Sequence, residues 1–181
     1  MKYYKEIILK DSRKCILRNA TEQDAAAALE IFILTHKQTD FLLSCPDEIK
    51  MTADDEAQYL KEKAVSENEI EIIAVIDEIL IGTAGIECIG NRYKTRHRAE
   101  FGISIDEKYW GLGIGSALTE ACIECAKKAG YVQLELNVVS GNESAVQLYK
   151  KFGFTEFGRN PRGFRSRSGG WQETVYMYLE L

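Results

Sequence analysis

Three glycines occupy alternate positions in the segment Tyr109-Trp110-Gly111-Leu112-Gly113-Ile114-Gly115-Ser116. The apolar residues 101–105 before it predict a strand, and residues 113–129 have the pattern of a helix. Glycine lets a ligand approach the backbone closely, and the N–H groups at a helix start are unpaired and lie at the positive end of the helix dipole. A strand, a glycine loop and a helix start together predict a phosphate site. We assign it to Gly111, Leu112, Gly113, Ile114, Gly115 and Ser116.

The spacing of these glycines argues against two common nucleotide sites. A dinucleotide fingerprint counted from Gly111 would need its third glycine at Ser116, and a P-loop would need a lysine that this loop lacks. From the loop alone, a tight strand-to-helix turn without a ligand remains the alternative.

A second motif follows the helix and a predicted strand at residues 132–139. The order of these segments resembles the GNAT superfamily of N-acetyltransferases, most closely over residues 100–158. Gly113 and Gly115 match the glycines of that family's acetyl-CoA pyrophosphate loop, Q/R-x-x-G-x-G/A, whereas Trp110 occupies the Q/R position. The family signature N-x-x-A-x-x-L-Y-x-x-x-G-F is met by Asn142, Ala145, Leu148, Tyr149, Gly153 and Phe154.

The resemblance implies an α+β GNAT fold, in which about four helices flank a mixed sheet of about seven strands. It implies a single N-acetyltransferase domain over residues 1–181, with acetyl-CoA as co-substrate. In this fold the strands before and after the central helix separate at one end, and the pantetheine arm pairs with the exposed edge of the first, here Ile103, Ser104 and Ile105. The acetyl group would pass directly from the thioester to a primary amine.

Candidate catalytic groups follow from the same match. Tyr149 matches the family tyrosine near the thioester sulfur and would protonate the departing thiolate, although a plain core tyrosine is the alternative. Glu100 matches a glutamate that acts through water as the base, and a solvated carboxylate at a strand end is its alternative. Glu135 and Asn137 lie on the neighbouring strand. Asn142 would contact the cofactor or simply cap a helix.

The remaining pattern predicts the elements around the acceptor. Thr21 to Asp24 resembles a capping box before a helix that ends near Lys37, and His36 on that helix is predicted to be a packed or rim residue. A second helix begins at Thr52, with Ala53, Ala57, Leu60 and Ala64 as its apolar line. In the family, the segment 38–51 lies over the acceptor pocket, so Phe41-Leu42-Leu43 would form a pocket wall or plain core. We predict a mobile loop at residues 160–170, also beside the acceptor, and a basic hairpin loop at residues 91–98.

The charge, the apolar runs and the cysteine count of the chain limit the kinds of partner and location that we expect. The formal net charge of −5 disfavours nucleic acid and suits a cationic amine. No apolar run approaches the ~20 residues of a membrane span, so we expect no membrane partner. The odd count of five cysteines, without a secretion signal, indicates reduced thiols and a cytoplasmic location. Cys122 and Cys125 are expected to pack in the core rather than bind metal, and no metal site is predicted.

The sequence leaves the acceptor open between an amino acid, a polyamine and a related small amine. Arg162, Arg165 and Arg167 bear on this choice: lining the pocket, they would favour an amine that carries a carboxylate, and facing solvent they would leave a polyamine possible. A protein N-terminus, as in ribosomal-protein acetyltransferases, and a non-catalytic acyl-CoA-binding module are the alternative functions. Val175, Met177, Leu179 and Leu181 would line either the core or a homodimer interface.

Overall fold

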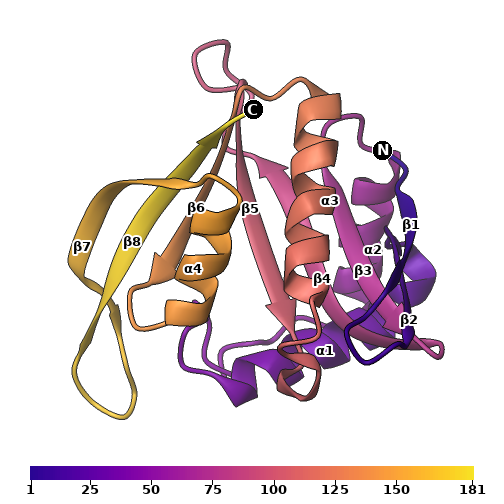
Figure 1. The fold of residues 1–181 in the computed structure, drawn as a ribbon, viewed down its shortest axis with the longest axis horizontal. Coiled ribbons are helices and arrows are strands. Elements are labelled where there is room, and N and C mark those ends of the chain that lie inside the picture. The colour runs from indigo at the N-terminus through magenta and orange to yellow at the C-terminus, as the bar shows by residue number, and fades with distance from the viewer.

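The computed structural model covers residues 1–181 and contains one eight-stranded sheet with four α-helices (Figure 1). The predicted α+β fold is confirmed, with one strand more than the expected seven or so. The strands are β1 Tyr4–Ile8, β2 Lys14–Asn19, β3 Ile70–Ile76, β4 Ile79–Cys88, β5 Arg98–Ile105, β6 Gln133–Val139, β7 Thr155–Arg165 and β8 Trp171–Glu180. The helices are α1 Ala25–Gln38, α2 Ala53–Val65, α3 Ile114–Ala129 and α4 Glu143–Lys151.

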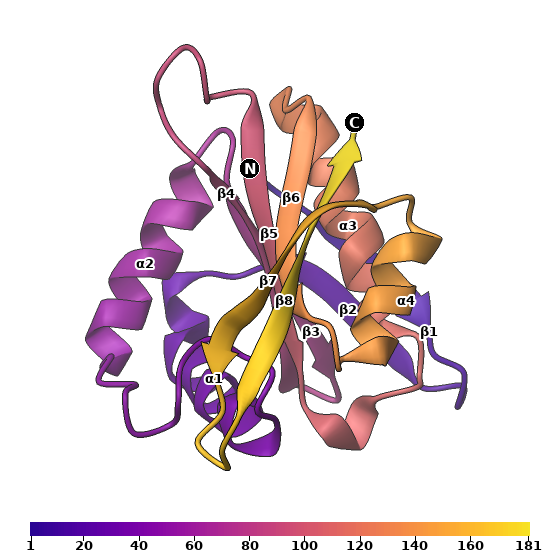
Figure 2. The same ribbon diagram turned by 90° about the vertical axis from the view of Figure 1, so that its left-hand side faces the viewer.

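The strand order across the sheet is β1-β2-β3-β4-β5-β6-β8-β7. All neighbouring strands run antiparallel except β5 and β6, which are parallel and are connected through α3. Helices α1 and α2 cover one face of the sheet, and α3 and α4 lie on the other (Figure 2). The two faces therefore belong to different helix pairs, and a ligand could approach the centre of the sheet from either side.

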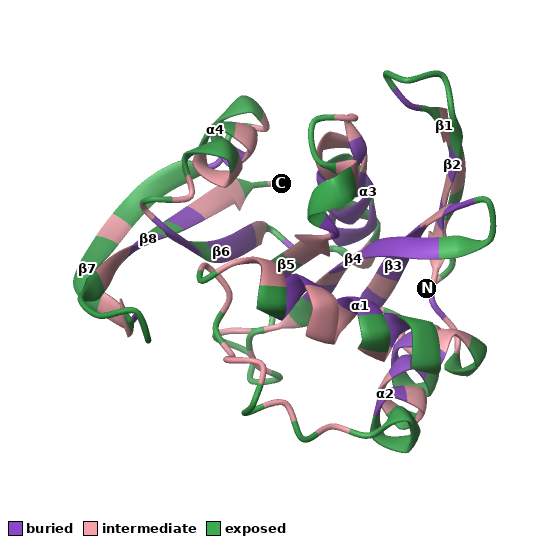
Figure 3. Cartoon of the chain, turned by 90° about the horizontal axis from the view of Figure 1, so that it is seen from below, coloured by how far each residue is buried: buried purple, intermediate pink, exposed green.

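The pairing of β5 with β6 is short. Only Arg98, Ala99 and Glu100 pair with residues 133–135, although β5 continues to Ile105 and β6 to Val139. Beyond Glu100 the two strands separate, as Figure 1 shows toward its lower edge and Figure 3 shows from that end. The edge of β5 that faces β6 is thus unpaired from residue 101 to 105. This is the separation that the family resemblance implies.

Capping boxes begin both helices on the α1 and α2 face. Asp24 accepts a hydrogen bond from the Thr21 backbone at 2.9 Å, but a short 3₁₀ turn precedes α1, which starts at Ala25. Thr52 and Asp55 form the box of α2, with the two side chains 2.6 Å apart. The predicted apolar line of α2 is wrong in part, because its buried residues are Glu56, Leu60 and Lys63.

The predicted mobile loop at residues 160–170 is also wrong in part. Strand β7 continues to Arg165, and Asn160 pairs with Thr174 and Phe164 with Gln172. The register is irregular between Asn160 and Phe164, which is where Pro161 lies. Proline lacks an N–H group and is tolerated at bulges and on edge strands, and β7 is the edge strand here. Only residues 166–170 form the turn.

The main core lies between the sheet and α3. Cys122 and Cys125 are buried there, and all five cysteines are unpaired, so the predicted packing role is confirmed. Val175 and Met177 are likewise core residues, while a homodimer stays a prediction. Buried residues concentrate on the central strands, and the outer sides of α2 and α4 are exposed (Figure 3). No helix of the chain is both long enough and apolar enough to cross a membrane.

Candidate active site

The glycine loop between β5 and α3 adopts a backbone that favours glycine. Gly111 has φ +78° and Gly113, which precedes the first residue of α3, has φ +100°. The backbone N–H groups of residues 111–116 donate to no acceptor within the protein. The Lys10 N–H donates to the Leu112 carbonyl at 3.3 Å and ties the loop to the β1–β2 turn. The loop therefore presents a row of free N–H groups at a helix start, as a phosphate requires.

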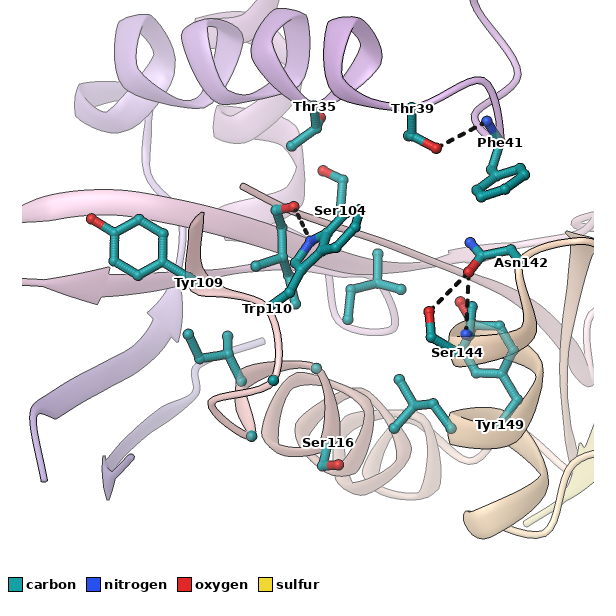
Figure 4. Close-up of a pocket in the computed structure, with 18 of the residues that line it drawn as sticks. Thr35, Thr39, Phe41, Ser104, Tyr109, Trp110, Ser116, Asn142, Ser144 and Tyr149 are labelled. Carbon is teal, nitrogen blue, oxygen red and sulfur yellow. Dashed lines mark hydrogen bonds between the residues drawn. The ribbon is translucent and has the colours of Figure 1, made fainter. Parts of the chain in front are cut away.

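A cavity of about 400 Å³ opens along this loop. The structure places ten of the predicted residues on its wall: Ile103, Ser104, Ile105, Gly111, Gly113, Ile114, Gly115, Ser116, Asn142 and Tyr149. Leu112 lies in a neighbouring hollow with Ile7 and Leu9. Figure 4 shows Asn142, Ser144 and Tyr149 on one side of the cavity, opposite Trp110 and Ser104. We call this cavity the cofactor cavity.

Trp110 stands where the family motif has glutamine or arginine. Its indole N–H donates to the Ile105 carbonyl at 2.8 Å and so occupies the last carbonyl of β5 (Figure 4). Lys10 also lines the cofactor cavity, and its ammonium forms no ion pair within the protein. Lys10 is thus the one lysine or arginine that lines the cofactor cavity. Sequence reasoning missed it because it arrives from the β1–β2 turn, about a hundred residues away in the chain.

Tyr149 and Asn142 are both positioned by α4. Tyr149 is 7% exposed and packs edge-on against Phe101, with ring centroids 6.0 Å apart. Its hydroxyl has no hydrogen-bond partner in the protein, and burial raises the pKa of this phenol above its usual range, which keeps it protonated. Asn142 caps α4 by accepting from the Ala145 N–H at 3.3 Å, as predicted for the capping alternative. Its side-chain amide N–H₂ has no partner in the protein and so remains available to a ligand.

A second cavity, of about 540 Å³, lies on the α1 and α2 face of the sheet. It shares Leu42, Ile103 and Ser104 with the cofactor cavity, so the two meet at the unpaired end of β5. Leu42 and Leu43 line it, so these two residues form a pocket wall, and that this pocket takes the acceptor stays a prediction. Glu100 lines this second cavity rather than the cofactor cavity. We call it the acceptor cavity.

Four glutamates line the acceptor cavity, namely Glu56, Glu71, Glu87 and Glu100. Burial raises the pKa of Glu71 to about 7, and burial together with nearby carboxylates also raises the pKa of Glu100. Glu87 is also desolvated, but hydrogen bonding to Lys63 at 2.9 Å outweighs this and lowers its pKa. Glu100 Oε1 lies 3.5 Å from the Asn137 amide nitrogen. Raised carboxyl pKa values of this kind are typical of functional sites.

Other candidate residues lie away from both cavities. Glu135 is bound by Arg98 in a two-point ion pair, which lowers the pKa of the carboxyl. Arg162 and Arg165 lie over the Trp171 ring at 5.5 and 5.7 Å, and Arg167 pairs with Asp47 at 2.5 Å. None of residues 160–170 lines either cavity, and their place at the acceptor stays a prediction.

His36 lines the acceptor cavity and is 7% exposed. Its Nδ1 lies 2.6 Å from the Phe32 carbonyl, which can only accept, so Nδ1 carries the proton. Burial lowers the pKa of this imidazole, which leaves it neutral at pH 7. The prediction of a rim residue therefore agrees with its position.

Sequence reasoning missed three of the four glutamates. The available signal was a charged residue inside an apolar run: Glu71 stands between Ile70 and Ile72 in β3. On α2, Glu56 lies one turn before the buried Leu60, a spacing that places it on the apolar face. Polar residues at such positions are errors in a core unless they serve a function.

The fold and these two cavities define an acyl-CoA-dependent transferase class, and comparison with known proteins identifies the family. A family model described as "Acetyltransferase (GNAT) family" matches residues 33–154. The chain therefore belongs to this family, whose members use acetyl-CoA, and the predicted N-acetyltransferase class and co-substrate are confirmed at that level.

Relatives with assigned activities are similar over part of their length. The L-amino acid N-acetyltransferase AaaT of Escherichia coli is 32% identical over 108 residues, which cover 59% of this chain and 65% of the relative. The ribosomal protein bS18-alanine N-acetyltransferase of Escherichia coli is 32% identical over 81 residues, 45% of this chain and 54% of that one. The chain thus spans less than two thirds of the length of either relative.

Solved structures extend the likeness over nearly the whole chain. The acetyltransferase of the GNAT family from Streptococcus pneumoniae has a TM-score of 0.88 and 30% identity, covering 92% of this chain and 99% of its own. The yncA protein of Salmonella typhimurium, solved with acetyl-CoA, has a TM-score of 0.82 and 19% identity, covering 92% and 94%. The second comparison bears on the fold alone.

Proposed function

We propose that this protein transfers an acetyl group from acetyl-CoA to the primary amine of a small molecule, by direct attack within a ternary complex. The observation that carries the proposal is the meeting of two cavities at Ile103 and Ser104. One cavity ends in a phosphate-type glycine loop, and the other is lined by carboxylates that suit an ammonium ion. Both substrates can then be present together, and no covalent enzyme intermediate is needed.

The residues of the cofactor cavity would hold acetyl-CoA by complementary groups. The free N–H groups of residues 111–116 would bind the pyrophosphate, with Lys10 as the accompanying cation. The unpaired edge of β5 at residues 103–105 would pair with the amides of the pantetheine arm. The thioester would then lie near Ser104, beside the Tyr149 hydroxyl.

The chemical step needs a neutral amine, since an alkylammonium with a pKa near ~10 is mostly protonated at pH 7. Glu100 would accept that proton through a chain of several water molecules, because Glu100 lies four residues, roughly 13 Å, along β5 from Ser104. The amine nitrogen then bonds to the acetyl carbon, the carbon–sulfur bond breaks, and the nitrogen releases its second proton to solvent to give the neutral amide. Tyr149 would donate its proton to the leaving thiolate and recover one from solvent.

The test is release of CoA from acetyl-CoA in the presence of a panel of primary amines, with calorimetric titration of acetyl-CoA alongside. Gly113→Glu should abolish acetyl-CoA binding, because it places a carboxylate among the phosphate-binding N–H groups and a side chain at φ +100°. Circular dichroism would establish that the variant is folded. Unchanged affinity in a folded variant would contradict the assignment of the loop.

Two results would favour the other candidate functions. Acetylation of a peptide N-terminus, with no small amine accepted, would favour a protein acetyltransferase like the bS18 relative. Tight acetyl-CoA binding without CoA release to any amine or peptide would favour a non-catalytic acyl-CoA-binding module.

A further inference from the structure

The acceptor cavity carries four glutamates, and no lysine or arginine lines it. No three acidic, histidine or cysteine groups of the chain converge to hold a metal ion, so an organic cation is the better counterpart. Resting on the proposed function, we infer that the acceptor is a diamine or polyamine, whose second ammonium ion is held by these carboxylates while the first nitrogen is acetylated beside Ser104.

Glu56 is the carboxylate of this cavity that has no partner within the protein. The residue is only 8% exposed, it lines the cavity, and its carboxylate forms no hydrogen bond or ion pair. Thr174 Oγ1 is the one sealed side-chain oxygen or nitrogen without a hydrogen bond, so the Glu56 oxygens are accessible from the cavity. A desolvated carboxylate is stabilised by an opposite charge beside it. An ammonium ion in the cavity would supply the partner that the chain does not.

Two glycines that pair with each other on neighbouring strands form part of the floor of the acceptor cavity. Gly85 of β4 pairs with Glu71 of β3 on one side and with Gly102 of β5 on the other. A Cβ at position 85 would overlap with Oε2 of Glu71, so glycine is what lets this carboxylate lie over the sheet. A Cβ at Gly102 would meet nothing within 4 Å, so the space above it is open. The two glycines thus leave room between the carboxylates for a thin, unbranched chain.

Only one of the four carboxylates is neutralised by a base. Glu87 pairs with Lys63 at 2.9 Å and accepts from the Tyr59 hydroxyl at 3.0 Å. Glu71 has two neutral hydroxyl neighbours, Tyr59 at 3.4 Å and Thr83, and Glu100 has only the Asn137 amide. Three of the four carboxylates therefore lack an ion pair, and such an acidic lining favours an ammonium ion over an acceptor that carries its own carboxylate.

The path along β5 suits an unbranched chain. Gly102 lies two residues from Ser104, or about 7 Å along the strand. An acceptor with its reacting nitrogen at Ser104 would therefore extend over the open space at Gly102 toward the carboxylates. The arginines of the β7–β8 hairpin, which could have recognised a carboxylate, stack on Trp171 or pair with Asp47 instead.

Three acceptors of equal chain length test the inference. We would measure kcat/KM for 1,4-diaminobutane, butylamine and 4-aminobutanoate at saturating acetyl-CoA. A charged hydrogen bond to a buried carboxylate predicts a preference of about 10- to 100-fold for the diamine over butylamine, with 4-aminobutanoate the poorest. Glu56→Gln should reduce the diamine-to-butylamine ratio about tenfold, mainly through the KM of the diamine.

The control is Glu62→Gln, which makes the same change on an exposed position of α2 and should leave the ratio as it was. Gly102→Ala provides a second variant that keeps every charge. Its added methyl meets no atom within 4 Å, so the fold is retained, and it should raise the KM of the diamine without altering the affinity for acetyl-CoA.

The outcomes separate the inference from the proposed function. Equal kcat/KM for the diamine and butylamine, or a preference for 4-aminobutanoate, would overturn the diamine inference and leave acetyl transfer to amines intact. An unchanged ratio in Glu56→Gln would overturn the role of the carboxylates. Failure of every amine to release CoA would overturn the proposed function itself.

Discussion

Glu71 provides a test of the acceptor cavity that does not depend on activity. Burial, aided by the nearby carboxylates of Glu56 and Glu87, raises the pKa of its carboxyl from 4.5 to about 7, against the opposite effects of Thr83 and Lys63. The Tyr59 hydroxyl is the remaining neighbour. At 1.36 kcal/mol per pKa unit, the rise corresponds to at most about 3 kcal/mol between the neutral and ionised forms.

The sign follows from the direction of this rise. Because the folded protein holds the proton more tightly, the contribution is fully present below pH 4.5 and is lost as pH rises to about 7. Glu71→Gln stays neutral, so its free energy of unfolding relative to the native sequence should increase by up to about 3 kcal/mol between pH 4.5 and pH 8.

Urea denaturation at the two pH values measures this change, with the native protein and Glu67→Gln, an exposed carboxylate, in parallel. The variant is compared with the native protein at each pH, and the two results are then compared with each other, so the contributions of the other titrating groups cancel. If the difference in free energy of unfolding between Glu71→Gln and the native protein were the same at pH 4.5 and pH 8, the reasoning would be refuted. That result would mean that the carboxyl is hydrated as well in the folded chain as in the unfolded one.

Two further predictions concern the cofactor cavity. Tyr149→Phe removes one hydroxyl and little volume, so kcat should fall by roughly 10²–10⁴-fold with acetyl-CoA affinity nearly unchanged, and an unaltered kcat with chemistry rate-limiting would exclude the hydroxyl as the acid. Lys10→Ala should weaken acetyl-CoA binding about fivefold at low salt and less at high salt, as expected for a partly screened charge on a phosphate. Lys2→Ala, an exposed lysine outside the cavity, is its control, and an equal effect of both would point to net charge alone.

Much of the fold could be predicted because its signals are local. A glycine before a helix, a capping pair and an alternating apolar pattern each predict one element from a few neighbouring residues. The structure shows these elements at Gly113, where φ is positive, at Thr21 and Thr52, and in the strands. The extension of β7 past Pro161 could not be predicted in this way. Proline ends most central strands, and only the position of β7 at the sheet edge makes the extension possible.

The cofactor site was accessible to sequence reasoning because its residues lie in two short motifs on either side of α3. The acceptor cavity was not accessible to sequence reasoning. The elements β3, β4, β5 and α2 each contribute one glutamate to it, and no spacing in the chain links these four residues. Glu71, Gly85 and Gly102 become neighbours only through the strand register. The ion pair of Arg167 with Asp47 likewise joins residues that are far apart in the sequence.

The short seam between β5 and β6 has a mechanical consequence. Within the sheet, only three residue pairs at positions 98–100 join a five-stranded half to a three-stranded half, while the packing of α3 and of Phe101 against Tyr149 adds side-chain contacts between them. A ligand that hydrogen-bonds to β5 while contacting α4 spans both halves and acts as a brace between them. At a free ligand concentration of a hundred times Kd, binding should raise the free energy of unfolding by about 2.7 kcal/mol. Because the ligand contacts both halves of the sheet, it should slow hydrogen exchange on both sides of the seam at once.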